Sequence, residues 1–333
     1  MSDKPKIALI GTGGTITSVG RHSLDMQDYT VTGQRMHPDE MLAKFPEAAA
    51  QAEVIPLRYK AVPSPEVGPS DWQVLVDTIE QAAGADDSLA GFVILHGTAT
   101  LEETAYALNL LVKVDKPVVL VGAQRPASGL SSDAGMNLTN AIRVAADPAS
   151  RGMGVLVVIN DEIQAAREVT KTSTYRLQTF RSPDFGVLGH ADADSVHYYR
   201  QPIRKHTIQT EFKIAAIQSW PRVDIVTSYA GADATAIKAF LAAGAKGLVS
   251  AALAPGYNTP HEVQALADAV ASGVPVVQST RAGSGRVFML HKGREAGFIS
   301  ADNLSPQKAR ILLACALTVS EDPAEIARMF ASY

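Results

Sequence analysis

Short runs of apolar residues alternate with amphipathic stretches along nearly the whole chain. In the first half these runs lie at residues 6–11, 91–95, 117–121 and 154–160. Each run is continuously apolar, which is typical of strands buried on both faces of a parallel sheet. Helical patterns lie between the runs. One extends from Ser70, a predicted N-cap, to about Ala83, and another opens at Thr100 with acidic residues in its first turn. The pattern predicts strands joined by crossover helices.

The same alternation returns in the last third of the chain. It predicts strands at 224–227, 247–251 and 275–278, and helices at 232–243, 260–272, 306–319 and 323–331. The polar segment between the halves has no clear period and is interpreted as a linker. The predicted fold class is α/β. A larger N-terminal parallel-sheet (Rossmann-like) domain spans residues 1–190, a linker spans 191–213, and a smaller C-terminal α/β domain spans 214–333.

Composition narrows the class of protein. Hydrophobic residues make up 46% of the 333 residues and charged ones 19%, which is typical of a soluble globular enzyme. A net charge of -4 favours neither nucleic acid nor an anionic membrane as partner, and the apolar runs are too short to span a bilayer. The strand pattern begins at Lys6 without room for a signal peptide, and Cys315 lies in an apolar stretch typical of a buried thiol. We therefore expect a cytoplasmic protein.

Three motifs directly follow predicted strands. They are GTGGT at 11–15, HGTAT at 96–100 and GAQRP at 122–126. Because the carboxyl ends of parallel strands meet at one edge of a sheet, these loops are expected to converge on one crevice. The glycine-rich motif lacks the Lys-Ser/Thr of a P-loop and a ribose-binding acid, so a nucleotide-binding dehydrogenase is a weak alternative. By itself the motif equally fits a tight turn with ordinary threonines.

Threonine and lysine side chains supply the candidate chemistry. A threonine at a strand end can act as a nucleophile when a base lies beside it. Thr98 and Lys171 are plausible partners for Thr15, although singly Lys171 also fits a surface charge and Thr98 a helix cap. The polar loop 17–33 fits either a surface loop or a lid over a substrate. Tyr29 in this loop can reach the Thr15 hydroxyl when such a lid closes.

Further motifs stand in a familiar order. They are DYTV at 28–31, SD at 132–133, IND at 159–161 and LSPQKAR at 304–310. With the three strand-end motifs, they make the chain resemble the bacterial L-asparaginase/glutaminase family of amidohydrolases over nearly its whole length. The resemblance implies two α/β domains, a small-molecule amide substrate, no metal and no organic cofactor. It also implies a homotetramer of intimate dimers, with each site completed by a neighbouring subunit.

The resemblance also assigns roles to residues. Thr15 is implied as the nucleophile with Tyr29 closing on it, and Thr98 and Lys171 as a second pair. Ser64, eight residues before Trp72 as in the family, is expected to hold the substrate carboxylate. The other expected substrate contacts are Gly14, Pro65, Gly97, Ala99 and the loop at Ala123. Which threonine attacks stays open at this stage.

The chain departs from the family where the substrate ammonium binds. The family has HGTDT, whose aspartate completes the Thr-Lys-Asp chain and pairs with the α-ammonium of asparagine, but this chain has Ala99. Pro65 stands where the family has Gln or Glu, and residues 282–287 lack the expected acidic residue. An unpaired buried ammonium costs about 1–3 kcal/mol or more, roughly tenfold to a hundredfold in affinity. Asparagine is therefore expected to be a poor substrate.

The resulting hypothesis is hydrolysis of an amide or related acyl bond in a small carboxylate without a free α-ammonium. Candidates are an acylated or deaminated asparagine analogue, a dicarboxylic monoamide, a cyclic imide or a lactone. Lys171, without its carboxylate partner, is expected to lose a proton more readily. Two alternatives are a genuine L-asparaginase, with Glu66 or a neighbouring subunit supplying the charge, and a catalytically silent protein that binds a small carboxylate.

Overall fold

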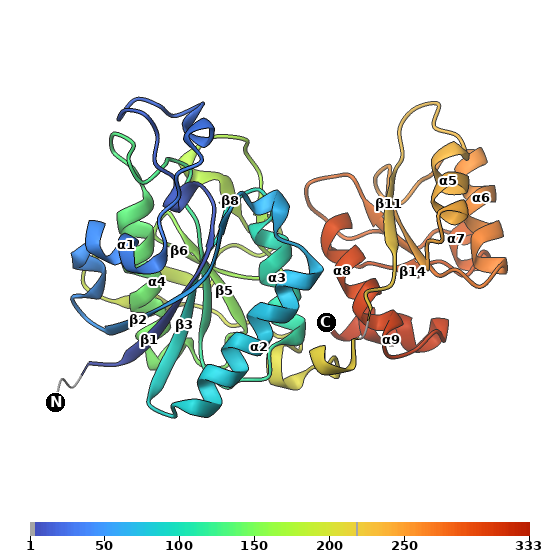
Figure 1. Ribbon diagram of the computed structural model, residues 1–333. Coiled ribbons are helices and arrows are strands. Elements are labelled where there is room, and N and C mark those ends of the chain that lie inside the picture. The colour runs from blue at the N-terminus through green and yellow to red at the C-terminus, as the bar shows by residue number, and fades with distance from the viewer. Residues whose placement is uncertain (1–3, 218) are drawn as a thin grey trace. The chain divides into compact units, whose positions relative to one another are not determined.

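The chain folds into two compact units, with the boundary between Gln209 and Thr210. The computed structural model describes residues 4–217 and 219–333 (Figure 1). The first unit contains β9 (Gly189–Ala191), which ends at the first residue of the predicted linker, and β10 (Val196–Tyr198), which lies within it. Strands of three residues are too short to show a hydrophobic period, so the sequence pattern did not reveal them. The first unit therefore extends beyond residue 190.

A mixed sheet forms the centre of the first unit. Its strand order is β10-β9-β6-β5-β4-β3-β1-β2, parallel from β5 to β2 and antiparallel from β5 to β10. The remaining bounds are β1 (Lys6–Gly13), β2 (Glu53–Val62), β3 (Leu89–Leu95), β4 (Val118–Val121), β5 (Val155–Ile159) and β6 (Glu162–Ala165). The apolar runs of the first half all lie in strands, as predicted. Strand β2 lies at the sheet edge, mixes polar and apolar residues, and was not predicted.

Helices cover both faces of this sheet. Figure 1 shows α2 (Pro69–Ala85) and α3 (Leu101–Leu111) on one side, with α1 (Pro38–Lys44) and α4 (Ala134–Ala146) on the other. Helix α2 begins before Ser70, so the prediction of Ser70 as N-cap is wrong. The cap is Gly68, whose backbone N–H donates to Asp71 Oδ2 at 3.0 Å.

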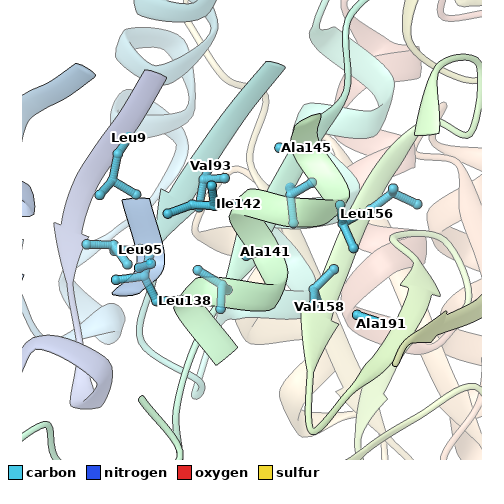
Figure 2. Packing of buried hydrophobic residues seen from close by; sticks show 14 of the residues in the cluster. Leu9, Val93, Leu95, Leu138, Ala141, Ile142, Ala145, Leu156, Val158 and Ala191 are labelled. Atoms are coloured by element: carbon cyan, nitrogen blue, oxygen red, sulfur yellow. The ribbon is translucent and has the colours of Figure 1, made fainter. Parts of the chain in front are cut away.

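Helix α4 packs apolar side chains on the strands (Figure 2). Leu138 and Ile142 of α4 are buried in one cluster with Val93 and Leu95 of β3 and Leu156 of β5. Burying each such side chain stabilises the fold by about 1.5–3 kcal/mol. The packing fixes the strands, and therefore the loops that leave their carboxyl ends.

The second unit is a smaller parallel sheet with helices. The strand order is β11-β12-β13-β14, with β11 (Val223–Thr227), β12 (Gly247–Ala252), β13 (Val276–Thr280) and β14 (Ile299–Ser300). Its helices are α5 (Thr235–Ala242), α6 (Pro260–Ala271), α7 (His291–Glu295), α8 (Pro306–Leu317) and α9 (Pro323–Ser332). The pattern predicted all of these except β14 and α7, which are too short to show a period. Cys315 is buried in α8, as expected. Within the described residues, no helix has the length and apolarity needed to cross a membrane.

Candidate active site

Loops from three strand ends of the first unit enclose a cavity of about 230 Å³. The predicted site residues that line it are Gly14, Thr15, Tyr29, Ser64, Pro65, Gly97, Thr98, Ala99 and Lys171. Ala123 does not line it, because its side chain is fully buried in the apolar cluster beside α4. The convergence predicted for the loops after β1 and β3 is thus observed, and the segment after β2 joins them.

Two glycines allow these loops to touch. Gly14 has a φ of 86°, and a Cβ placed on it would lie 2.1 Å from Gly97 Cα. A Cβ on Gly97 would lie 2.8 Å from Ser64 Cβ. Because any side chain would push the backbones apart, glycine is required at both positions. This contact brings the hydroxyls of Thr15, Ser64 and Thr98 to the wall of one cavity.

Thr15 is paired with the loop that follows it. Its Oγ1 shares a hydrogen bond of 2.8 Å with the Tyr29 hydroxyl. The two ends of the loop are joined by a β-bridge between Ser18 and Arg35, and Asp25 accepts from the backbone N–H groups of Arg21 and Asp28. This loop therefore carries the Tyr29 hydroxyl to the Thr15 hydroxyl.

Lys171 is held against Thr98. It lies in β7 (Thr170–Lys171), which pairs with β8 (Phe180–Arg181), and its Nζ donates to Thr98 Oγ1 at 2.7 Å. Burial lowers the pKa of Lys171, while the negative charge of Glu102 on α3 acts in the opposite direction. The pKa of Lys171 is thus lowered, as expected, but by burial rather than by the missing aspartate on which the expectation rested.

The charge of the cavity wall is positive. Lys171 and Arg35 are the charged side chains among the described residues that line it. Glu66, the residue considered as a substitute for the missing aspartate, is exposed and does not line the cavity. No carboxylate is therefore placed at this wall, in the described part of the chain, to receive an ammonium.

The neighbouring His96 has a structural role. It is fully buried, and its Nδ1 lies 2.8 Å from the carbonyl oxygen of Gly97. Burial lowers the pKa of His96 to about 4, so the ring is neutral at neutral pH. A neutral ring that bonds to the Gly97 carbonyl helps to fix the loop that carries Thr98.

Sequence reasoning missed Arg35, together with Ser18, Thr30 and Pro63, as cavity residues. The predicted lid loop ended at residue 33, before Arg35. The bridge between Arg35 and Ser18 depends on tertiary pairing, which a local sequence pattern does not reveal. A basic residue just beyond a polar lid was the available signal. The described residues contain no group of three or more His, Cys, Asp or Glu side chains that could hold a metal ion.

Comparison with known proteins identifies the family of the chain. Residues 6–204 match the family described as "Asparaginase, N-terminal", and residues 222–330 match "Glutaminase/Asparaginase C-terminal domain". "L-asparaginase 2" of Escherichia coli is 39% identical over 99% of this chain and 93% of its own length. "Glutaminase-asparaginase" of Pseudomonas fluorescens is 36% identical over 98% and 90%.

A solved structure gives the same result. The probable cytoplasmic L-asparaginase of Campylobacter jejuni superposes with a TM-score of 0.94 at 36% identity, over 99% of this chain and all of that one. Both domains, their order and their fold agree along the whole length. The chain belongs to the asparaginase family of amidohydrolases, hydrolases that act on amide carbon–nitrogen bonds.

Proposed function

We propose that this protein hydrolyses the amide bond of a small carboxylate that lacks a free α-ammonium. The observation that carries the proposal is a cavity with paired threonines and a lysine, but with Ala99 and no described carboxylate on its wall. A zwitterionic substrate would leave its ammonium unpaired beside cationic side chains. That arrangement disfavours asparagine by roughly tenfold or more.

Thr15 is proposed as the nucleophile. Its Oγ attacks the amide carbonyl carbon, an ester forms, and ammonia leaves with the proton that the hydroxyl loses. Water then attacks the ester, which releases the acid and restores the Thr15 hydroxyl. The hydrogen bond to Tyr29 orients Thr15 and gives its proton a path.

Lys171 is proposed as the base for the second step. Its lowered pKa increases the neutral fraction near physiological pH, and neutral Nζ accepts a proton through the Thr98 hydroxyl. A water molecule against Thr98 is thereby activated. Ser64 is proposed to donate to the substrate carboxylate, since its backbone carbonyl is fixed by Thr100 Oγ1 at 2.8 Å.

A second candidate is ordinary L-asparaginase or glutaminase-asparaginase activity. The names of the relatives at 36–39% identity favour it. It requires a carboxylate from outside the cavity wall described here, which a neighbouring subunit of a homotetramer would supply. We propose that assembly, and light scattering of the purified protein measures its mass directly.

The location of the protein is also proposed rather than established. A relative from Haemophilus influenzae is named "Probable L-asparaginase periplasmic", whereas the Campylobacter jejuni protein is named cytoplasmic. Composition leads us to propose the cytoplasm. Fractionation of cells that express the native gene tests this.

Ammonia release from a panel of amides tests the function. The panel holds L-asparagine, D-asparagine, L-glutamine, N-acetyl-L-asparagine and succinamic acid. We expect turnover of the last two, loss of turnover in Thr15→Ala and partial activity in Thr15→Ser. Thr78→Ala on α2 is the control, because Thr78 does not line the cavity.

Each other outcome has a definite meaning. Strong turnover of L-asparagine would favour the second candidate. Full activity of Thr15→Ala would remove Thr15 as nucleophile and shift attention to Thr98. Binding of small carboxylates without any turnover would indicate a silent binding protein.

A further inference from the structure

Arg35 is a cation of the cavity that the proposed mechanism does not use. It follows the loop that carries Tyr29 and lines the cavity with Lys171. Its backbone is fixed by the bridge to Ser18 and by the neighbouring bond from Met36 N to the Thr17 carbonyl, 2.8 Å long. The backbone pairing therefore holds Arg35 at the cavity without help from its side chain.

The guanidinium of Arg35 has no acidic partner within the described residues. Its Nε is enclosed, and no protein group there accepts a hydrogen bond from it. Nearby arginines differ. Arg58 forms a two-bond pair with Asp39, at 2.8 and 2.6 Å, and Arg21 Nε lies 3.5 Å from Asp25. Because a guanidinium binds carboxylates through paired N–H groups, an arginine without such a partner at a cavity suits an anionic ligand.

We infer that Arg35 pairs with a carboxylate of the substrate and makes the cavity select amides of net negative charge over zwitterionic ones. The inference rests on the proposed function, because it assumes that the cavity is the substrate site. It adds a specificity-determining residue and a charge rule to that proposal. Monoamides of dicarboxylic acids and N-acylated asparagine or glutamine satisfy the rule, because each keeps one free carboxylate and has no ammonium.

Selection follows from attraction and repulsion together. An anion gains a charge-assisted pair with Arg35, while an ammonium at the same wall is repelled by Arg35 and Lys171. Removing only the charge of Arg35 should therefore weaken the binding of anions and strengthen the binding of zwitterions. If Arg35 had a purely structural role, its substitution would change the affinities for both kinds of ligand in the same direction.

Succinate and L-aspartate are the probes, because they share two carboxylates and differ by the ammonium group. Binding of each to the full-length protein is measured by calorimetry. We expect succinate to bind at least about tenfold more tightly. In Arg35→Gln the succinate affinity should fall by about tenfold or more, so that the ratio of the succinate affinity to the L-aspartate affinity approaches one. Arg35→Lys should retain part of the preference for succinate. Arg58→Gln is the matched control, since Arg58 does not line the cavity.

The inference is overturned if L-aspartate binds as tightly as succinate to the unaltered protein. It is also overturned if Arg35→Gln leaves the ratio of the two affinities unchanged. The thermal midpoint of Arg35→Gln checks its folding, and Arg35→Lys replaces it if it unfolds. Succinate binding through Arg35 without hydrolysis of any amide would remove the proposed function alone. Hydrolysis of succinamic acid that does not depend on Arg35 would remove this inference alone.

Discussion

The first unit has a mixed sheet and the second a fully parallel one, and the two units also differ in what their polar side chains contact. In the second unit Glu262 accepts from Ser228 Oγ at 2.6 Å and from Thr259 N at 3.0 Å. Asn258 Nδ2 donates to Ser250 Oγ at 2.8 Å. These groups satisfy one another, so the network stabilises its own unit.

In the first unit the polar side chains beyond the strand ends face a cavity. Thr15, Lys171 and Arg35 all line it, and Arg35 Nε has no acceptor in the described protein. A sheet with loops beyond its strand ends is therefore not sufficient to make a site. A site arises where side chains keep hydrogen-bonding capacity for a ligand.

The strongest test of this comparison removes a charge from each unit. Lys171→Met should lower the hydrolysis rate by about 10²- to 10⁴-fold, because the proposed base is lost. Lys238→Met on the exposed face of α5 removes the same charge from the second unit and should leave the rate unchanged. Ammonia release measures both. Near-normal activity of Lys171→Met would contradict the role of the pair with Thr98.

Ala99→Asp restores a carboxylate to the cavity. The new charge should raise the pKa of Lys171, against the effect of burial, because it favours the ammonium form. The neutral base then appears only at higher pH, so the rise of rate with pH should move upward by roughly one unit or more. A pH–rate profile on the best substrate measures the shift. A downward shift would be inconsistent with Lys171 as the base.

The same Ala99→Asp protein should accept asparagine better. A carboxylate on the wall gives the α-ammonium a partner, so kcat/KM for L-asparagine should rise by roughly tenfold to a hundredfold. The comparison is made at a pH above the shifted rise of the pH–rate profile, where Lys171 of the variant is neutral. Ala99→Asn is the control, since it adds a polar group without charge. Equal gains in both variants would argue against ammonium pairing.

Tyr29→Phe removes the hydroxyl that contacts Thr15. The rate should fall by about tenfold, the loss expected for one hydrogen bond of about 1.4 kcal/mol at the nucleophile. Tyr257→Phe, an exposed tyrosine of the second unit, removes the same atom without effect on rate. If both variants behave alike, Tyr29 has no role in the reaction.

Glu262→Gln tests the other side of the comparison. Loss of the charged acceptor should lower the free energy of unfolding of the second unit by about 1–3 kcal/mol. The pH dependence of hydrolysis should keep its position, because Lys171 and Thr98 keep their contacts. Urea unfolding and the pH–rate profile measure the two effects. A shift of the profile would show that the network is coupled to the site.

The sequence determined much of this protein by itself. Continuous apolar runs identified the central strands β1, β3, β4 and β5 of the first sheet and β11, β12 and β13 of the second, since burial on both faces demands them. The motifs at 11–15 and 96–100 identified the family, Thr15 and Thr98, and the absence of the aspartate at Ala99. Each of these features lies within a short segment of the chain, so it can be recognised in the sequence without knowledge of the structure.

Tertiary structure alone decided the rest. The resemblance implied the pair of Thr98 and Lys171, but their contact is tertiary, because Lys171 lies 73 residues from Thr98 on β7, which pairs with β8. Arg35 lies at the cavity because of its bridge to Ser18. Strands β9 and β10 belong to the sheet because of their pairing, which their local sequence pattern does not predict. Local patterns report burial and turns, whereas contacts between distant segments depend on how the whole chain packs.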